Sequence, residues 1–454
     1  MTVARQLADF LTGTAMGDLP SQTLDHAAMV IASTIASAAC GTGIESAQII
    51  RAMVQENGGR PDAPVWFSPG TKLPAAAAAQ VNAVLSDAAA SDDSDLRAIV
   101  HAGTPLTAAS LAIAEREGRN GGEVLTAIVL GYEAAGRISE AVTPGFKDRG
   151  FHGCLGAIFA ASVAAGRLLR LDAAQMAQAI AISATSIGGL ATAADTSVAR
   201  EYHAGAAALQ GVNAALAAQR GYLAEERILE TPKGFFEAFG GVNGAVAAEI
   251  ALRDLGRSWD IVTDMAVKLV PGGHPYHAFA EAAANAARDG NIAAADIESI
   301  TVSRPGLTAL SGPRHPATLI DMAHSPAYFL AAGAADKSFG WVHASPAKIG
   351  DPVIHALIDR VRVGAEPTED AGRYRQGARV TIRTHDGRTS ASTVFEPHGS
   401  GALGIAWSDI DAKYRTLVPA SGLGSDAIEA SLSVIHDFRQ ASGVTGLTNL
   451  LRVP

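Results

Sequence analysis

Apolar residues recur at helical spacing through most of the first 255 residues of this chain, and no other feature constrains the fold as strongly. Gly, Pro or Asp residues separate the apolar blocks. The blocks lie near residues 22–39, 43–56, 74–90, 104–117, 121–141, 153–169, 172–190 and 200–220. Only 5% of the chain is aromatic, and much of its apolar share is alanine, which favours helix and allows helix backbones to approach closely. The sequence therefore predicts a tightly packed bundle of many helices.

The pattern changes after the first 266 residues. Residues 297–302 alternate as a strand does, and residues 379–384 and 389–395 are typical of a β-hairpin closed by a Gly-containing turn. Three helical stretches accompany these strands, at residues 277–287, 317–333 and 351–360. This alternation predicts a smaller α+β domain.

The helical period returns at Trp407, where Ser408 is a candidate N-cap. A chain of 454 residues exceeds what one hydrophobic core usually covers. We therefore predict a mainly α protein with an α+β second domain. The helical bundle is expected at residues 1–266 and 407–454, and the inserted α+β domain at residues 267–406.

The net charge and the cysteine content limit which partners and which cellular compartment are expected. The net charge is −10 with no Lys/Arg run, which argues against a nucleic acid or an anionic membrane surface as partner. Cys40 and Cys154 lie in Ala/Gly-rich stretches and are expected to be buried free thiols. The N-terminus does not resemble a secretory signal, and the uncharged stretch 173–194 contains too many polar residues for a membrane span. We expect a soluble, cytoplasmic protein.

Three histidines occur where an apolar helical pattern begins or breaks: His101, His152 and His277. Imidazole is the side chain that most readily takes or gives a proton near neutral pH. These positions predict proton-transfer chemistry. The structural alternative for His101 is that it caps the helix expected near Thr104, and His152 can equally be a buried, hydrogen-bonded histidine.

Several standard catalytic signatures are absent from the sequence. It has no Gly-rich phosphate loop with Lys-Ser/Thr, no dinucleotide spacing after a strand and no Gly-x-Ser-x-Gly elbow. The cysteines and histidines lack zinc spacing, since Pro275 interrupts the pair His274 and His277 and no third ligand is evident. The sequence therefore predicts a site without cofactor or metal.

A succession of short segments resembles the MmgE/PrpD family, and it covers nearly the whole chain. The segments are Asp92-Asp93-Ser94 with His101, Gly131-Tyr132-Glu133 with Arg137, Gly150-Phe151-His152, Arg200 to Ala207, Lys268 to His277, and Ala323 to Tyr328. The resemblance implies a helical domain, an inserted α+β lid domain, an active site in the cleft between them and a homodimer. It also implies a small di- or tricarboxylate substrate.

The resemblance also assigns residues to this cleft. It implies catalytic roles for His101, His152, His277 and Tyr328. The expected substrate-binding residues are Asp92, Asp93, Ser94, His203, Arg149, Arg200 and Lys268. Structural alternatives exist for most of these residues. Tyr328 can be a core tyrosine, and Asp92 and Asp93 can form a solvated turn. Arg200 and Lys268 can be interdomain or surface charges, and His203 can be a structural histidine, as can His274. Only its neighbour His152 supports a role for Arg149.

The chain departs from the pattern common among the dehydratases and decarboxylases of this family. Where those members have an Asp-Asp-Thr motif followed by a histidine, this chain has Ser94 in place of the threonine and Asp95 in place of the histidine. An acidic residue four positions before the threonine is replaced by Ala90, and a lysine ahead of the helix with His203 is replaced by Arg200. Arginine cannot shuttle protons, but its planar fork can hold a carboxylate.

Losing an acid and a lysine weakens dehydration and decarboxylation, whereas epimerisation needs only proton removal and return. We therefore predict epimerisation of an iminodisuccinate-like substrate. The alternatives are a 2-methylcitrate dehydratase-type or cis-aconitate decarboxylase-type lyase, and a polycarboxylate-binding dimer without catalytic activity.

Overall fold

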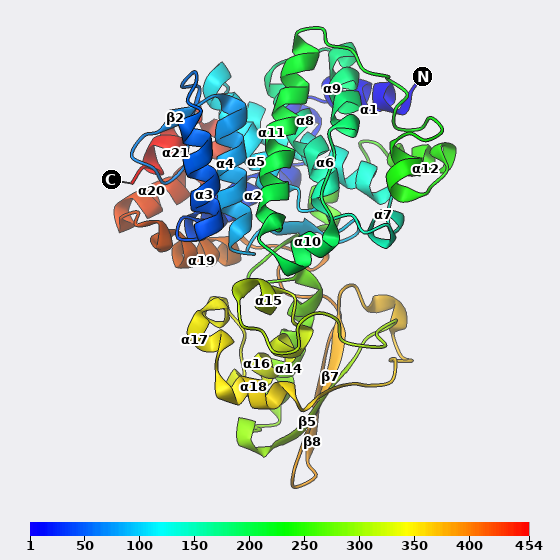
Figure 1. Cartoon of the computed structure of the whole chain (residues 1–454), viewed down its shortest axis with the longest axis vertical. Coiled ribbons are helices and arrows are strands. Elements are labelled where there is room, and N and C mark those ends of the chain that lie inside the picture. Colours follow the sequence, from blue (N-terminus) through cyan, green and yellow to red (C-terminus); the bar gives the residue numbers. More distant parts are fainter. Residues whose placement is uncertain (454) are drawn as a thin grey trace. The chain divides into compact units, whose positions relative to one another are not determined.

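The computed structural model describes residues 1–453, which form two compact units. Unit 1 comprises residues 1–267 and 405–454, and unit 2 comprises residues 268–404. Unit 1 is built almost entirely of helices, whereas unit 2 combines helices with a four-stranded sheet (Figure 1). The predicted fold class, mainly α with a smaller α+β domain, is confirmed.

Each predicted apolar block of unit 1 is a helix. These helices are α2 (Ser21–Gly41), α3 (Glu45–Glu56), α4 (Ala75–Ala88), α5 (Gly103–Glu117), α6 (Gly121–Glu140), α8 (Cys154–Leu168), α9 (Ala173–Thr185) and α11 (Ala199–Gln219). Helix α9 ends five residues earlier than predicted, because Gly188 and Gly189 follow it and Gly189 adopts a positive φ of 128°.

Shorter elements complete unit 1. The helices are α1 (Val3–Gly13), α7 (Gly145–Asp148), α10 (Ala191–Thr196), α12 (Gly244–Ala251), α13 (Asp260–Thr263), α19 (Trp407–Leu417), α20 (Ser425–His436) and α21 (Thr445–Leu450). Strand β1 (Ala63–Pro64) pairs with β2 (Lys72–Leu73), and β3 (Asp93–Asp95) pairs with β4 (Met265–Val267). The predicted N-cap is wrong: Ala406 occupies that position of α19, and Ser408 lies inside the helix.

Small residues allow the central helices of unit 1 to pack closely. A Cβ atom added to Gly211 on α11 would lie 2.7 Å from the Cβ of Ala161 on α8 and 2.8 Å from the carbonyl oxygen of Ile158. Helices α6, α8 and α11 lie together in Figure 1. Backbone contacts this close exclude any larger side chain, so the alanine and glycine content is what makes this bundle possible.

Helix α2 is long and apolar enough to cross a membrane by length and composition, but 89% of its most apolar window is buried inside the structure. A helix that is apolar on all sides is typical of the centre of a large helical protein. The stretch 173–194 contains the 13-residue helix α9 and the first turn of α10, and neither helix reaches the ~20 residues needed to span a bilayer. Within residues 1–453 neither cysteine forms a disulfide, and Cys154 is buried whereas Cys40 is partly buried.

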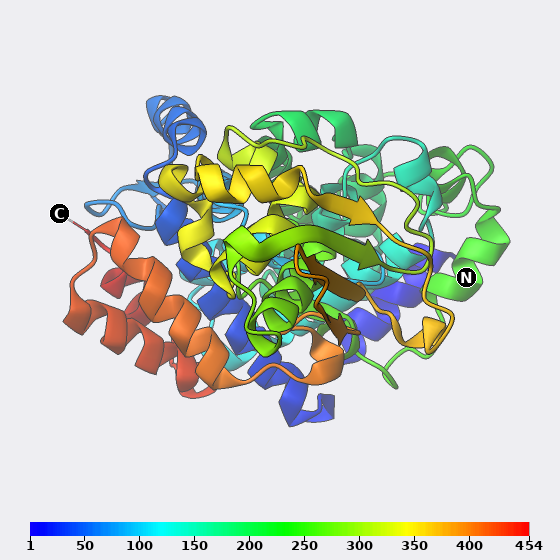
Figure 2. The same cartoon turned by 90° about the horizontal axis from the view of Figure 1, so that it is seen from below.

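The sheet of unit 2 has the strand order β6-β5-β7-β8 (Figure 2). Strand β5 (Ile297–Ser303) pairs in parallel with β6 (Val361–Val363) and antiparallel with β7 (Ala378–Thr384), and β7 pairs with β8 (Thr389–Val394). The predicted hairpin is therefore correct. The three-residue strand β6 was not predicted, because it is too short to show an alternating pattern.

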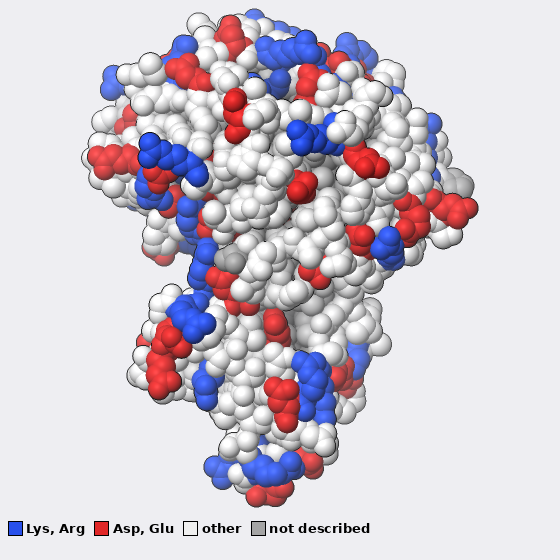
Figure 3. All heavy atoms as spheres, turned by 180° about the vertical axis from the view of Figure 1, so that it is seen from behind, with Lys and Arg blue, Asp and Glu red and all other residues white. Residues whose placement is uncertain are grey.

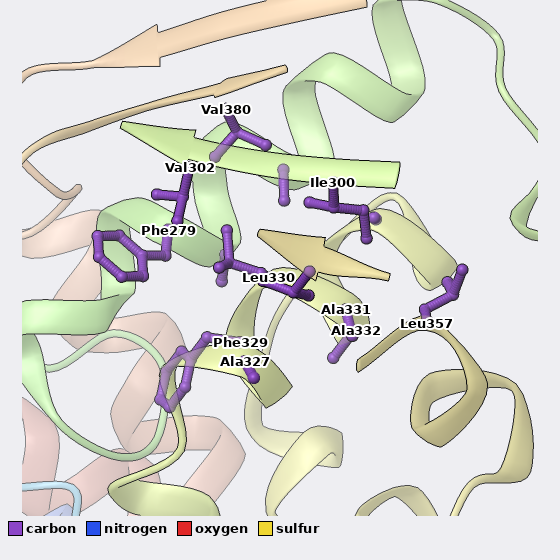
Figure 4. Packing of buried hydrophobic residues seen from close by; sticks show 14 of the residues in the cluster. Phe279, Ile300, Val302, Ala327, Phe329, Leu330, Ala331, Ala332, Leu357 and Val380 are labelled. Carbon is purple, nitrogen blue, oxygen red and sulfur yellow. The ribbon is translucent and has the colours of Figure 1, made fainter. Parts of the chain in front are cut away.

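Helices α14 (His277–Asp289), α16 (Pro326–Asp336) and α18 (Pro352–Ile358) pack in unit 2 with its sheet. The helix predicted at 317–333 is two helices, α15 (Leu319–Ala323) and α16, because Pro326 begins a new helix whose N-cap is Ser325. The core lies between sheet and helices, where Val302 and Val380 meet Phe279 and Leu330 (Figure 4).

We predict that Gly211→Ala destabilises unit 1, because the added methyl group overlaps α8, at a cost of about 1–3 kcal/mol. The matched control is Gly13→Ala, where nothing lies within 4 Å of the added Cβ atom and helix propensity favours alanine. Thermal midpoints compared at one scan rate should fall only for Gly211→Ala. Equal midpoints for the two variants would contradict this interpretation of the helix packing.

Candidate active site

The segment that begins with Asp92 is held in unit 1 by strand pairing. Strand β3 pairs antiparallel with β4, with Asp93 opposite Val267 and Asp95 opposite Met265. Asp92, Asp93 and Ser94 are all buried, so they do not form a solvated turn. The Asp93 carboxylate accepts a hydrogen bond from the backbone N–H of Gly103, the first residue of α5. This bond joins the segment to the start of α5, two residues after His101.

His101 is oriented by three oxygen atoms around its Nδ1 atom. Oδ2 of Asp92 lies 2.8 Å away, the carbonyl oxygen of Asp93 2.9 Å away and Oγ of Ser94 3.0 Å away. Because a carboxylate and a carbonyl can only accept, Nδ1 carries the proton that they share. In the neutral ring, Nε2 is then the basic nitrogen. His101 does not cap α5, whose N-cap position is Ala102.

His152 lies directly before α8, between two glycines that the local geometry requires. Gly150 has a φ of 83°, in the left-handed region. A Cβ atom on Gly153 would lie 2.0 Å from the carbonyl oxygen of Ile99. This close approach brings the start of α8 next to the segment before α5. The rings of His101 and His152 consequently stack, with centroids 5.8 Å apart and planes 30° apart.

His203 on α11 is the third histidine of this group, which we call the histidine cluster (His101, His152 and His203). Its Nδ1 atom lies 3.4 Å from Nδ1 of His152, and the ring centroids are 5.4 Å apart. Gly189 lies next to both residues: its carbonyl accepts the backbone N–H of His152, and a Cβ atom added to it would lie 3.1 Å from Nδ1 of His203. The sequence predicted a structural or substrate-binding role for His203. In the structure, His203 directly contacts His152.

A pocket of about 300 Å³ opens beside His203. Its lining comes from the N-terminal end of α8, the segment after α9 and α11. The lining residues are Cys154, Leu155, Ile158, Ser186, Ile187, Gly188, Gly189, Tyr202, His203, Ala206, Ala207 and Gln210. This volume is at the lower end of the range for small-ligand sites.

The environment of His152 favours its neutral form. Burial lowers the pKa of His152 well below its ordinary value of 6.5, and the neighbouring His101 and His203 lower it further. Burial also lowers the pKa of His203. Removing an imidazolium ion from water is costly, and a second positive charge nearby adds to that cost. His152 is therefore an uncharged imidazole at neutral pH, as a general base must be.

Arg200 is committed to a buried ion pair with Asp87. Its Nε donates to Oδ2 of Asp87 at 3.0 Å, and its Nη2 donates to the carbonyl oxygens of Asp87 and Ala88. Two of its three nitrogens are thus occupied, which leaves little of the planar fork for a substrate. Arg149 lies at the end of α7 and donates to the carbonyl of Ala238. Substrate binding by Arg149 or Arg200 stays a prediction.

Unit 2 contains the remaining predicted residues. His277 begins α14, is buried, and has its Nε2 atom 3.3 Å from the carbonyl oxygen of Gly272. Its ring lies 4.8 Å from that of His274 and stacks at 6.1 Å on Phe329. Lys268 is the first residue of unit 2 and is also buried.

Tyr328 belongs to the hydrophobic core of unit 2. Its side chain is fully buried, and its hydroxyl donates to the carbonyl oxygen of His343 at 2.9 Å. Burial raises the pKa of this hydroxyl. These are the features of a core tyrosine, the structural alternative considered above. Its catalytic role stays a prediction.

A network of ion pairs next to β3 was not predicted from the sequence. Arg97 pairs with Asp260 at 2.5 Å, and Asp95 accepts the backbone N–H groups of Arg97 and Ala98. Glu133 pairs with Arg137 on α6 and accepts the N–H of Asp260. Part of this network could have been predicted, because Glu133 lies four positions before Arg137 on a predicted helix, a spacing that favours an ion pair.

A buried lysine from the C-terminal part of the chain supports the same region. Lys413 on α19 donates to the carbonyl oxygen of Ser91 at 2.5 Å and to Oγ of Ser33 at 2.8 Å. Ser91 directly precedes Asp92, so Lys413 fixes the start of the segment that orients His101. Within residues 1–453, no group of three or more His, Cys, Asp or Glu side chains is arranged to hold a metal ion.

Two family models match successive parts of the chain. The MmgE/PrpD N-terminal domain matches residues 5–246, and the MmgE/PrpD C-terminal domain matches residues 271–434. The chain belongs to the MmgE/PrpD family. The two matched regions together cover most of both units.

Curated relatives of this family align over the full chain. A cis-aconitate decarboxylase of Homo sapiens is 23% identical over 468 residues, covering 100% of this chain and 95% of the relative. A cis-aconitate decarboxylase of Aspergillus terreus is 27% identical over 483 residues, covering 100% of this chain and 96% of the relative. The family resemblance described from the sequence is thereby confirmed.

We predict that Asp93→Asn changes how stability depends on pH. Burial raises the pKa of Asp93 from 3.8 to about 6, and repulsion from Asp92 acts in the same direction. Because the pKa of Asp93 is higher in the folded than in the unfolded state, protonated Asp93 favours folding and ionised Asp93 opposes it. The stabilisation by the protonated form is therefore lost as pH rises from about 4 to about 6. Relative to wild type, the asparagine variant should gain thermal stability across that interval. A constant difference between the two midpoints would contradict the raised pKa.

Proposed function

We propose that this chain is an enzyme that removes a proton from carbon next to a carboxylate of a small polycarboxylate, with His152 as the base. The observation that carries the proposal is the buried, neutral His152 between His101 and His203. His101, whose Nδ1 proton faces Asp92, stacks on His152 and keeps Nε2 as the basic nitrogen of its neutral ring. The cis-aconitate decarboxylase relatives support a polycarboxylate as the substrate.

Within this class we propose epimerisation of an iminodisuccinate-like substrate. Two features support it: Ala90 replaces an acid, and Arg200 replaces a lysine and is bound to Asp87. Neither position supplies a proton donor to a leaving group or a new carbanion. The second candidate is decarboxylation of a cis-aconitate-like tricarboxylate, which the names of the relatives favour. The expected homodimer and cytoplasmic location stay predictions.

Proton NMR in D2O distinguishes these reactions. Purified protein is incubated separately with iminodisuccinate, cis-aconitate and 2-methylcitrate. Deuterium at the α-carbon of iminodisuccinate, with interconversion of its stereoisomers, is the expected result. Loss of CO2 from cis-aconitate would replace epimerisation by decarboxylation while keeping the proposed class of substrate. No change in any of the three would contradict the proposed function.

We predict that His152→Ala lowers the rate of this deuterium exchange by about 10²- to 10⁴-fold, the usual contribution of a general base. Substrate binding, followed by calorimetry, should be retained, because the variant removes the base and keeps the surrounding pocket. His436→Asn is the matched control, since His436 is an exposed histidine of the same unit that pairs with Asp411 on α19. A polycarboxylate-binding protein without catalytic activity would show binding and no exchange in wild type.

We predict that activity persists at acidic pH. Burial lowers the pKa of His152 well below 6.5, so the base stays deprotonated as the pH falls through that value. The acidic limb of kcat/KM against pH should therefore lie below pH 6.5. A limb at or above pH 6.5 would show that an ordinary, solvated imidazole controls the rate.

A further inference from the structure

Three arginines line a pocket of unit 1 that shares no residue with the histidine cluster. The pocket has a volume of about 720 Å³ and lies where α6 begins and α8 ends. Arg167, Arg170 and Arg439 line it, together with one carboxylate, Glu123. These side chains leave two net positive charges, three from the arginines less one from Glu123. The chain as a whole carries −10, so the charge of this pocket has the opposite sign to the net charge of the chain. On the face in Figure 3, Lys and Arg side chains lie interspersed with Asp and Glu.

Arg167 is held in place without being neutralised. Its Nη1 donates to the carbonyl of Thr12 at 2.7 Å, and its Nη2 donates to the carbonyl of Thr14 at 2.9 Å. Within residues 1–453, no carboxylate lies within ion-pair distance of it, and burial lowers its pKa. The two carbonyls therefore satisfy hydrogen bonds and orient the guanidinium, while its charge stays available to an anion.

Arg170 occupies a backbone position that normally selects glycine. It follows the end of α8 with a φ of 58°, in the left-handed region, which costs a non-glycine residue about 1 kcal/mol or more. Its guanidinium pairs with Glu123 at 3.0 Å. Glu123 also accepts the backbone N–H of Asn120 at the start of α6. The one carboxylate of the pocket is therefore already engaged.

The pocket is separate from the histidine cluster. His152 lies directly before the first turn of α8, whereas Arg167 lies in its last turn. A helix of 15 residues is about 22 Å long, so one small molecule cannot reach both. The lining also includes four uncharged polar residues, Asn120, Thr126, Gln440 and Ser442.

We propose that this pocket is a second binding site, for a small multivalent oxyanion bearing carboxylate or phosphate groups. Guanidinium groups bind either anion through paired, charge-assisted hydrogen bonds, and three of them suit a ligand with more than one anionic group. Arg167 is fixed by the carbonyls of Thr12 and Thr14. Arg170 and Arg439 are exposed, so their side chains can adjust to the ligand. The proposal does not depend on the reaction that the histidine cluster carries out.

The test is calorimetric titration of the whole chain with pyrophosphate and, separately, with tricarballylate. We expect at least one probe to bind, and the double variant Arg170→Gln/Arg439→Gln to weaken that binding about tenfold or more. Binding of pyrophosphate alone identifies a phosphorylated ligand, and binding of tricarballylate alone identifies a polycarboxylate. Where tricarballylate also occupies the histidine cluster, the double variant should lose one of two sites.

Arg220→Gln is the matched control, because Arg220 is an exposed arginine of the same unit whose side chain donates to the carbonyl oxygen of Leu216 on α11. It should leave the affinity unchanged. The single variant Arg439→Gln changes a surface residue and keeps the test decisive should the double variant fold poorly. Equal affinity in wild type and the pocket variants, or dissociation constants above about 10 mM for both probes, would overturn the proposal.

Discussion

The close approach of helix backbones in unit 1 is the constraint on which its candidate site depends. Gly153 lets the start of α8 touch the carbonyl of Ile99, and Gly156 lies against Ser139 of α6 in the same way. These contacts bring the segments before α5 and α8 close enough for the rings of His101 and His152 to stack. A Cβ atom at Gly153 would push the two segments apart. The glycines around His152 are therefore requirements of the site geometry as well as of the helix packing.

Close packing also determines the electrostatics of the site. Because His152 and Asp93 are buried and His101 is partly buried, water solvates their charged forms poorly, so each needs a partner or becomes neutral. The structure uses both solutions. His101 faces the Asp92 carboxylate, whereas His152 faces other imidazoles and loses its affinity for a proton. Two histidines 5.8 Å apart are thus given different chemical characters by their neighbours alone.

Much of this fold could be predicted from the sequence, because most of its helices are determined by residues that are close together in the chain. Helix boundaries such as those of α5 and α6 follow from apolar period and Gly or Asn punctuation, which neighbouring residues decide. The pairing of β3 with β4 joins residues about 170 positions apart through three-residue strands, so no local pattern announces it. The split at Pro326 could have been read from the sequence, since proline favours a helix start over a helix interior.

The candidate site was predictable in its residue types and less so in its contacts. The flanking glycines and the family resemblance pointed to His152. His203 joined the cluster because α11 passes His152 in space, which no spacing in the sequence shows. For Arg200 the sequence predicted a carboxylate clamp. Its actual partner is Asp87 on α4, a charge that the sequence gave no reason to place nearby.

The identity of that partner bears on the choice of reaction. Epimerisation and decarboxylation of a carboxylic acid both pass through a carbanion or enolate next to a carboxylate, and they differ in what leaves the carbon. A neutral imidazole suits the reaction in which a proton leaves, since it accepts that proton and can return it. Decarboxylation instead requires a donor that is protonated before the reaction begins. A buried histidine with a lowered pKa and an arginine bound to Asp87 are both poor sources of that first proton, which is why we propose proton abstraction although the relatives are decarboxylases.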